Sequence, residues 1–585
     1  MATATPSVAP AGPRGPATLV YYSLLALVVA RILVTPWATM WLWGLNTPRF
    51  LLLPAGLMTL AAMAVPFSRR AGRPVAAALA AFGDRLAASR AWRLGTAALA
   101  ALGVWTLDDR TQFIGDALIR NAASGSPEFL ARFRQALPLE LLLFERLPLA
   151  LEARGLPAGM VPRLIGLAAA FALALAALGL GRELARRGAG LLAVASLVGC
   201  GGWLATFTGL GKPAAVLCAL TAIAALAAMR AARRGQGIAI LGVAVFAAMA
   251  LHRAGVLLLP AWALGLAVRA PAPGPRPPRA LAWALAWASA LLPLVALALF
   301  GPRILHIAAT IDVPAHVTAA DSPWRALDLA NLALLLSPAA AAVLPVAIVC
   351  AARWARTREA LVLLALAGPW LAAGLIAVPA QGLFRDLDFF APAGVASGAL
   401  AAWLLCRLPD DPARAPRLAA AVTLTSAAGA LQLLLCFHDP AGGLERVRAW
   451  LAEPPARTAM EREPVWDFLA LRAFALRQWP LAATASEQAS RIAPNPRLLI
   501  MLGIARTYVG DDAGADSAYR AVLERSPYEP VAWAGRLGIA TRHGRRALAD
   551  TAIANVRLYS PATARGRELR AVMAEYPEAF PAALR

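Results

Sequence analysis

Long runs of alanine, leucine and valine recur along the chain up to about residue 437, and they restrict the fold more than any other feature. Hydrophobic residues make up 60% of the 585 residues, and charged residues only 15%. About 20 consecutive apolar residues allow a helix to cross a bilayer, where the backbone must satisfy its own hydrogen bonds. We therefore predict an all-α protein whose larger part is a polytopic helical membrane domain.

The apolar runs predict about thirteen membrane spans within residues 18–437. The pair at 236–268 is short on both sides of its central break, so a re-entrant hairpin is the alternative there. Residues 1–17 are rich in proline and alanine and predict a disordered tail without a signal-peptide pattern. The spans lie near residues 18–36, 50–67, 92–107, 161–181, 188–208, 213–229, 236–251, 254–268, 280–301, 326–350, 360–380, 389–407 and 417–437.

Arginines gather in alternate breaks between these spans, which predicts the orientation of the chain. Cytoplasmic loops of membrane proteins carry an excess of positive residues. The N-terminus then lies in the cytoplasm and everything after residue 437 on the outer side. We expect a protein of the bacterial inner membrane with its C-terminal region in the periplasm. The arginine-rich breaks are 68–73, 182–187, 229–234, 268–279, 352–358 and 407–417.

The net charge of +23 is largely accounted for by these breaks. No basic stripe with interleaved aromatic residues appears, so we expect contacts with membrane lipids and no nucleic-acid partner. The five cysteines lie within or at the ends of apolar runs and lack the spacing of metal ligands. Neither a disulfide framework nor a zinc site is therefore predicted.

A second pattern begins near residue 463, after a predicted linker at 438–462. Three sets of residues recur at intervals of 33 and 34 positions, namely Trp466, Leu499 and Trp533, then Ala482, Ala515 and Ala549, then Pro494, Pro527 and Pro561. This period resembles that of tetratricopeptide repeats. The resemblance implies an α-solenoid over 463–585, with three units and a final capping helix. Such an array either binds a protein or peptide partner in its concave groove or braces the membrane domain.

A set of ionisable residues that includes most of the acidic residues near the span ends shares the predicted outer side. A helix over 107–121, at the start of an outward loop 107–160, would align Asp109, Gln112, Asp116 and Arg120 on one stripe. An interfacial amphipathic helix explains that stripe without catalysis. A polar functional site is the alternative, because charges at membrane depth are costly. The outer set comprises Asp108, Asp109, Asp116, Lys212, His252, Arg253, His306, Asp321, Arg385, Asp386 and Asp388.

Many spans, an Asp-Asp pair in an early outward loop and the amphipathic segment 137–156 together resemble the GT-C superfamily of membrane glycosyltransferases. The added outward repeats resemble the arrangement of protein O-mannosyltransferases. The resemblance implies a polyprenyl-phosphate-linked sugar as donor and Asp108 or Asp109 as the catalytic base at the outer face. The substrate-binding residues that it implies are Asp116, Lys212, His252, Arg253, Arg385, Asp386 and Asp388.

Two other functions remain open from the sequence. An enzyme like an O-antigen ligase or an oligosaccharyltransferase would use the loop 302–325, with Arg303, His306, His316 and Asp321. A non-enzymatic membrane-anchored scaffold would recruit a partner through the repeats. The sequence assigns no cofactor, although Asp386 and Asp388 can share a divalent cation if their backbone is extended. The same two residues can equally form a local ion pair and turn.

Overall fold

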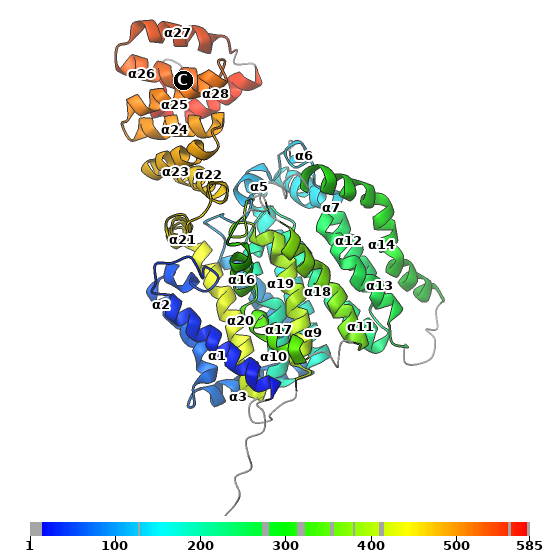
Figure 1. Cartoon of the computed structure of the whole chain (residues 1–585). Coiled ribbons are helices and arrows are strands. Elements are labelled where there is room, and N and C mark those ends of the chain that lie inside the picture. Colours follow the sequence, from blue (N-terminus) through cyan, green and yellow to red (C-terminus); the bar gives the residue numbers. More distant parts are fainter. Residues whose placement is uncertain are drawn as a thin grey trace, which may run out of the picture. The chain divides into compact units, whose positions relative to one another are not determined.

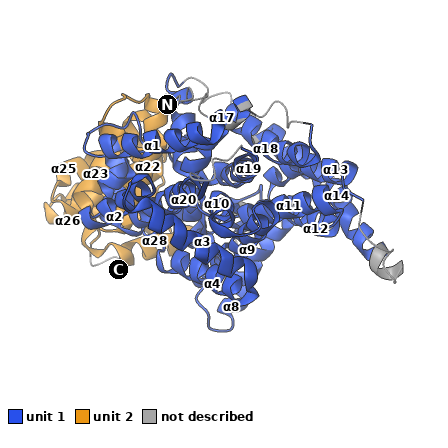
Figure 2. Ribbon diagram, turned by 90° about the horizontal axis from the view of Figure 1, so that it is seen from below, with its two compact units in different colours: residues 1–449 blue, residues 450–585 orange. Residues whose placement is uncertain are grey.

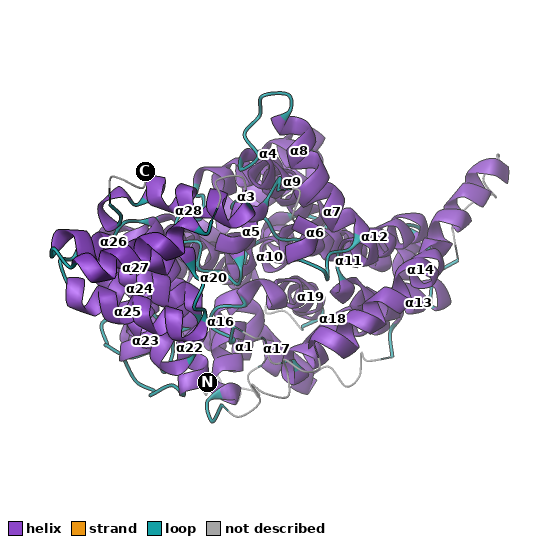
Figure 3. Cartoon of the chain, turned by 90° about the horizontal axis from the view of Figure 1, so that it is seen from above, coloured by secondary structure: helices purple, strands orange, loops and turns teal. Residues whose placement is uncertain are grey.

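The computed structural model describes residues 15–126, 129–271, 280–312, 322–350, 356–377, 379, 381–408, 415–559 and 563–581. Helices and loops account for all of these residues, and none of them forms a strand (Figure 3). The all-α prediction is therefore confirmed. The chain divides into two compact units, unit 1 over Met1–Ala449 and unit 2 over Trp450–Arg585, which are coloured separately in Figure 2.

Seven helices in the described part of unit 1 are long and apolar enough to cross a membrane. This confirms a membrane-type helical domain but gives fewer long spans than the thirteen predicted. The seven helices are α1 (Pro16–Val34), α9 (Met160–Leu184), α11 (Ala214–Arg234), α14 (Ala280–Ile307), α18 (Arg358–Ile376), α19 (Leu387–Leu405) and α20 (Ala415–His438) (Figure 1).

The remaining predicted spans coincide with shorter helices. The predicted continuous span at 326–350 is a pair of helices, α16 (Arg325–Leu336) and α17 (Pro338–Cys350), bent by 113° at their junction. Pro338 explains the break, because a proline disfavours helical backbone at the preceding residue. The other shorter helices are α2 (Leu53–Ala64) with η2 (Val65–Phe67), α4 (Arg90–Thr106), α10 (Gly188–Gly199), α12 (Ile238–Leu251) and η5 (Arg253–Leu258) with α13 (Leu259–Ala267). One further helix, α3 (Gly72–Ala88), was not predicted.

Helix α19 is the most enclosed of the seven long helices, because 83% of its most apolar stretch is buried. It packs against α10, α11, α17 and α18. Small residues make this close packing feasible, since a side chain at Gly398 would collide with the carbonyl of Leu197 in α10. Helix α14, by contrast, is only 17% buried and exposes Leu285, Leu294 and Leu299. In a bilayer, such an exposed leucine surface suits contact with lipid.

The segment after α4 differs from the predicted helix over 107–121. Residues 107–116 form an irregular loop, and only α5 (Ala117–Ala123) is helical. Gln112 and Gly115 adopt left-handed backbone conformations, with φ of 59° and 53°, and these interrupt a right-handed helix. The rest of the predicted outward loop consists of α6 (Phe129–Arg132), α7 (Pro138–Leu141), η3 (Leu142–Arg146) and α8 (Leu147–Glu152).

The loop 302–325, suggested as an alternative catalytic loop, begins as helix. Helix α14 continues to Ile307 and is followed by η6 (Ala308–Asp312), while His316 and Asp321 lie outside the described residues. Arg303 donates hydrogen bonds to the backbone carbonyls of Arg134 and Ala136, at 3.1 and 2.9 Å. Its guanidinium therefore fastens α14 to the segment before α7.

Unit 2 is built of successive helix hairpins, α22 (Ala459–Ala475) with α23 (Trp479–Ile492), α24 (Pro496–Tyr508) with α25 (Asp512–Arg525), and α26 (Pro530–Arg542) with α27 (Arg546–Arg557). Helix α28 (Ala564–Glu575) and the short η7 (Pro577–Ala579) follow. The predicted linker at 438–462 holds another helix, α21 (Pro440–Ala452).

The 33- and 34-residue spacings reappear in this packing. The second helices of the hairpins begin at residues 479, 512 and 546. Tyr519 in α25 is fully buried, and a side chain added at Gly503 in α24 or at Gly535 in α26 would collide with its ring. Small residues in the first helices thus accommodate a large one from the second, which locks neighbouring hairpins together.

Candidate functional site

Six charged residues from four separate parts of unit 1 form a buried charge cluster, and Lys212 lies at its centre. The Nζ atom of Lys212 is 2.5 Å from Oδ1 of Asp116 and 2.6 Å from Oδ2 of Asp388. Only 8% of the Lys212 side chain is exposed, so both ion pairs are largely shielded from water. The cluster consists of Asp116, Arg120, Glu140, Lys212, Asp386 and Asp388.

Arg120 extends the cluster toward the short helices between α5 and α9. Its Nε atom lies 2.9 Å from Oδ2 of Asp116, and its Nη1 atom lies 2.5 Å from Oε1 of Glu140. The guanidinium also stacks 4.3 Å from the ring centroid of Phe133. Glu140 is 1% exposed. A buried carboxylate requires such a partner, since an unpaired one would lose its hydration without compensation.

The irregular backbone before α5 allows Asp116 to reach Lys212. The amide of Gly115 donates a hydrogen bond of 2.9 Å to the carbonyl of Arg385, which joins this loop to the segment before α19. A side chain at Gly115 would collide with Nζ of Lys212 and with Oδ1 of Asp388. Glycine at this position is therefore required by both its left-handed backbone and the crowding around it.

Asp386 and Asp388 occupy the start of α19. Asp386 is the residue before the first helical position, and its Oδ2 accepts a hydrogen bond of 3.0 Å from the amide of Gln381. Asp388 lies in the first turn, where the helix dipole favours a negative charge. Its Oδ2 is paired with Lys212, whereas its buried Oδ1 has no hydrogen-bond partner among the described atoms.

Burial and neighbouring charges shift the pKa values of Asp116 and Asp386 in opposite directions. Burial alone would raise the pKa of Asp116, but the positive charges of Lys212 and Arg120 outweigh that effect and lower it. Burial likewise opposes the positive charge of Lys212, yet the surrounding carboxylates raise its pKa. For Asp386, burial and the adjacent negative charge of Asp388 raise the pKa to about 7. One carboxylate is thus fixed as an anion, while Asp386 gains and loses a proton near neutral pH.

Asp108 and Asp109, which the GT-C resemblance implied as catalytic, make their hydrogen bonds and ion pairs elsewhere. Oδ1 of Asp108 lies 3.1 Å from Nδ1 of His438 and 3.3 Å from Nε of Arg110. Oδ1 of Asp109 accepts a hydrogen bond of 2.7 Å from the amide of Gln112 and so stabilises the turn. Both residues lie where the loop meets the end of α20, because the amides of Arg110 and Thr111 donate to the carbonyl of Phe437.

Of the other predicted site residues, His252 lies near the cluster and Arg385 adjoins it. Nδ1 of His252 accepts a hydrogen bond of 3.2 Å from the amide of Ala254. Burial and the charges of Arg253, Arg120 and Lys212 hold the pKa of His252 well below its usual value, so its imidazole is neutral. Arg253 is the first residue of η5, and its positive charge is close enough to lower the pKa of His252.

Sequence reasoning missed Arg446, which is fully buried in α21. Its Nη2 atom donates a hydrogen bond of 3.2 Å to the carbonyl of Trp43, and its guanidinium lies 4.6 Å from the ring centroid of Phe384. The Nε and Nη1 atoms have no hydrogen-bond partner among the described atoms. Burial lowers the pKa of Arg446 to about 10, so it remains a cation at neutral pH. The sequence does contain a signal, because Gly443 and Ala449, three residues before and after Arg446, place it on an apolar face of the helix.

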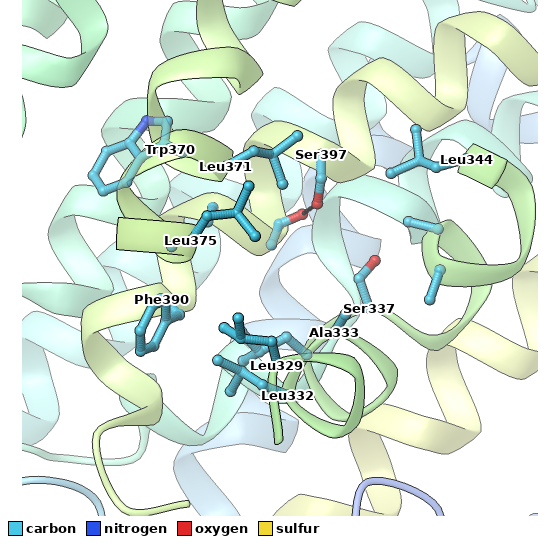
Figure 4. Close-up of a pocket in the computed structure, with 16 residues that line it drawn as sticks. Leu329, Leu332, Ala333, Ser337, Leu344, Trp370, Leu371, Leu375, Phe390 and Ser397 are labelled. Atoms are coloured by element: carbon cyan, nitrogen blue, oxygen red, sulfur yellow. Dashed lines mark hydrogen bonds between the residues drawn. The ribbon is translucent and has the colours of Figure 1, made fainter. Parts of the chain in front are cut away.

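An apolar cavity of about 370 Å³ lies among α16, α17, α18 and α19 (Figure 4). Phe390 and Ser397 line it from the same helix, α19, whose start holds Asp386 and Asp388. Leu371 and Leu375 of α18 line it too and are 43% and 67% exposed at the outer surface of the helix. The cavity therefore lies beside a surface suited to lipid, a setting that favours an apolar chain as its occupant.

No protein-family model matches the chain, and neither a curated protein nor a solved structure shows significant similarity to it. Within the described ranges, no group of three or more histidine, cysteine, aspartate or glutamate side chains is arranged to hold a metal ion.

Replacing Gly115 with alanine is expected to disrupt the cluster. The added methyl group would displace Lys212 from its carboxylates and strain the left-handed backbone, at a cost of about 2–4 kcal/mol. Thermal unfolding of the detergent-solubilised protein should show a clear loss of stability. The matched control is Gly103→Ala in α4, where nothing lies within 4 Å of the new methyl group. Equal stability of the two variants would contradict the packing described for Gly115.

Proposed function

We propose that unit 1 is a GT-C-type membrane glycosyltransferase, which transfers a sugar from a lipid-phosphate donor to an acceptor at the outer face of the membrane. The observation that carries the proposal is the buried charge cluster, in which Asp386 titrates near neutral pH beside the fixed ion pairs of Lys212. Pairs of carboxylates whose acidities are driven apart by their environment are typical of acid–base sites. The start of α19 joins this cluster to the apolar cavity.

Asp386 is the general base in this proposal. An acceptor hydroxyl attacks the anomeric carbon of the donor sugar while its proton passes to the Asp386 carboxylate. The new bond joins the acceptor oxygen to the anomeric carbon, and the bond from that carbon to the lipid phosphate breaks. The phosphate leaves with the bonding electron pair. A base with a pKa of about 7 is well matched to this step at neutral pH.

Asp116 is a weaker candidate for the base. Its two ion pairs hold its pKa low, which makes its carboxylate a poor proton acceptor. Its proposed role is to position Lys212. Asp108 and Asp109 are proposed to shape the turn at the end of α20, since their side chains bond to His438 and to the amide of Gln112.

Arg446 is the proposed donor to the leaving phosphate. Two of its N–H-bearing nitrogens have no partner among the described atoms, whereas Lys212 is already engaged by two carboxylates. Arginine suits a phosphate because its planar fork presents several donors to the oxygens. Phe384, against which Arg446 stacks, precedes Arg385 and Asp386 in the chain, so the cation and the proposed base are attached to one short segment.

The lipid part of the donor is proposed to occupy the cavity lined by Phe390, Leu371 and Leu375. Its apolar lining and exposed leucines suit a hydrocarbon chain entering from the bilayer. The proposed topology counts the shorter helices and the bent pair α16–α17 as further crossings, thirteen in all with the seven long helices. The N-terminus is then cytoplasmic in a bacterial inner membrane, and unit 2 is a periplasmic tetratricopeptide-type array.

Asp386→Asn is expected to lower the transfer rate by about 10²- to 10⁴-fold, because the amide cannot take the proton. The wild-type rate should rise with pH through about 7, as Asp386 loses its proton, and the variant should lose that dependence. The assay follows the release of undecaprenyl phosphate from a panel of undecaprenyl-phosphate hexoses in nanodiscs.

The controls for this assay are Asp108→Asn and Asp109→Asn, which should retain the pH dependence. Loss of activity in these variants with full activity in Asp386→Asn would move the base to the Asp-Asp pair. If all three variants leave cell-envelope glycans unchanged in a strain lacking the native copy, the chain is a scaffold and the transferase proposal fails.

Arg446→Met is expected to separate activity from stability. Replacing a buried charge by an apolar side chain of similar length should leave the thermal stability equal or higher. Transfer should nevertheless fall by about 10²- to 10³-fold, as for loss of one donor to a developing anion. A variant that loses stability and activity together would indicate that Arg446 only supports the fold.

A further inference from the structure

The first helices of the three hairpins in unit 2, α22, α24 and α26, pack side by side. In arrays of helix hairpins, one set of equivalent helices lines the concave face, where extended surfaces for partners arise. A segment that touches all three of these helices must run along the face that they share. The C-terminal end of the described chain does so.

The crossing begins with α28, which packs against α26 (Figure 1). Leu569 and Met573 lie one turn apart on this helix and are 4% and 3% exposed. Beyond the helix, the ring of Tyr576 lies 4.8 Å from Phe474 of α22, in an edge-on arrangement. Within a few residues, the chain has therefore passed from the last hairpin to the first.

Tyr576 enters an aromatic pocket made by the first hairpin and α24. Trp479 stacks on Tyr508, with ring centroids 4.1 Å apart, and its centroid lies 6.1 Å from that of Tyr576, with the two ring planes 82° apart. Phe474 and Trp479 thus both contact the half-buried ring of Tyr576, and Tyr508 supports Trp479. Aromatic pairs of this geometry contribute about 0.5–1.5 kcal/mol each beyond their area burial, so Tyr576 is a strong anchor.

A second anchor follows four residues later. Phe580 is 2% exposed and Ala579 is fully buried, while η7 packs on α24. The carbonyl of Ala579 and the ring of Pro581 approach Gly538 of α26 so closely that a side chain there would meet them at 2.9 and 3.4 Å. The backbone between the anchors bonds within itself, from the amide of Ala579 to the carbonyl of Tyr576 at 3.1 Å.

The sequence of this segment has the character of a peptide ligand. Tyr576-Pro577 and Phe580-Pro581 are two aromatic–proline pairs, four residues apart. Each proline restricts the backbone before binding and so reduces the entropy lost when the neighbouring ring is buried. The segment therefore combines the ring contacts of Tyr576 and the buried ring of Phe580 with the close approach of Ala579 and Pro581 to Gly538.

We propose that the shared face of α22, α24 and α26 is a peptide-binding groove that residues 576–581 occupy in cis. Its partner is an extended peptide with two aromatic–proline pairs spaced as in this segment, and that peptide must displace the chain's own end. The aromatic pocket of Phe474, Trp479 and Tyr508 takes the first ring, and the surface beside Gly538 takes the second pair. The proposal concerns unit 2 and does not depend on the transferase proposed for unit 1.

The test uses a fluorescein-labelled synthetic peptide with the sequence of residues 575–581, added to the full-length protein in detergent. Because the tethered segment competes at a high effective concentration, the wild-type protein should bind this peptide weakly. A chain ending at Glu575, and the double variant Tyr576→Ser with Phe580→Ser, should bind it at least tenfold more tightly by fluorescence anisotropy. The control variant is Tyr528→Ser, whose side chain is 65% exposed and should leave the affinity unchanged.

Hydrogen exchange of α22, α24 and α26 accompanies each measurement. Retained protection together with tighter binding supports the proposal, as does loss of binding when the peptide's two aromatic residues are replaced by serine. Retained protection without a gain in affinity overturns it. Loss of protection in both the shortened chain and the double variant also overturns it, since residues 576–581 would then be part of the fold.

Discussion

The pairing of one buried lysine with two carboxylates is the interaction on which the organisation of unit 1 depends. Lys212 connects Asp116, in the loop after α4, with Asp388 at the start of α19, and it does so where only 8% of its side chain meets solvent. Removing a charge from water costs several kcal/mol unless its partners are in place. The three segments must therefore come together for any of them to be stable. This requirement explains why the loop departs from helical geometry at Gln112 and Gly115.

The same constraint gives the cluster its chemical character. With Asp116 and Asp388 held against Lys212, the nearby Asp386 experiences a buried environment and a neighbouring negative charge, and its pKa rises to about 7. Arg446 is a second consequence of close packing, since it is a cation enclosed by Trp43 and Phe384 with part of its donor set unused. Transfer from a lipid-linked donor needs a proton acceptor, a cation and an apolar site, and the proposal assigns these to Asp386 before α19, to Arg446 in α21 and to the cavity that α19 lines. Phe384, on which Arg446 stacks, and α19 connect the three parts.

Much of the helical architecture was predictable, because apolar runs report burial or lipid contact directly. Helices occur at each predicted span, but composition could not tell that the run at 326–350 breaks at Pro338 or that several helices are short. The choice of Lys212, Asp386 and Asp388 came from sorting charges by membrane side. The predicted stripe through Asp109 and Asp116 was wrong, because a helical period was assumed across two left-handed residues. Arg446 was not predicted because its hydrogen bond and its ring contact are made with Trp43 and Phe384, which are distant in sequence.

A thermodynamic cycle on Lys212 and its two carboxylates tests most directly whether the buried lysine and its partners depend on one another for stability. Thermal unfolding is measured for the wild type, Lys212→Met, the double variant Asp116→Asn with Asp388→Asn, and the triple variant. Removing the lysine alone should be the most damaging change, since it leaves two buried negative charges uncompensated. Neutralising both acids in that background should recover a substantial part of the lost Tm. Losses that simply add in the triple variant would contradict the account, because they would show that the three side chains act independently.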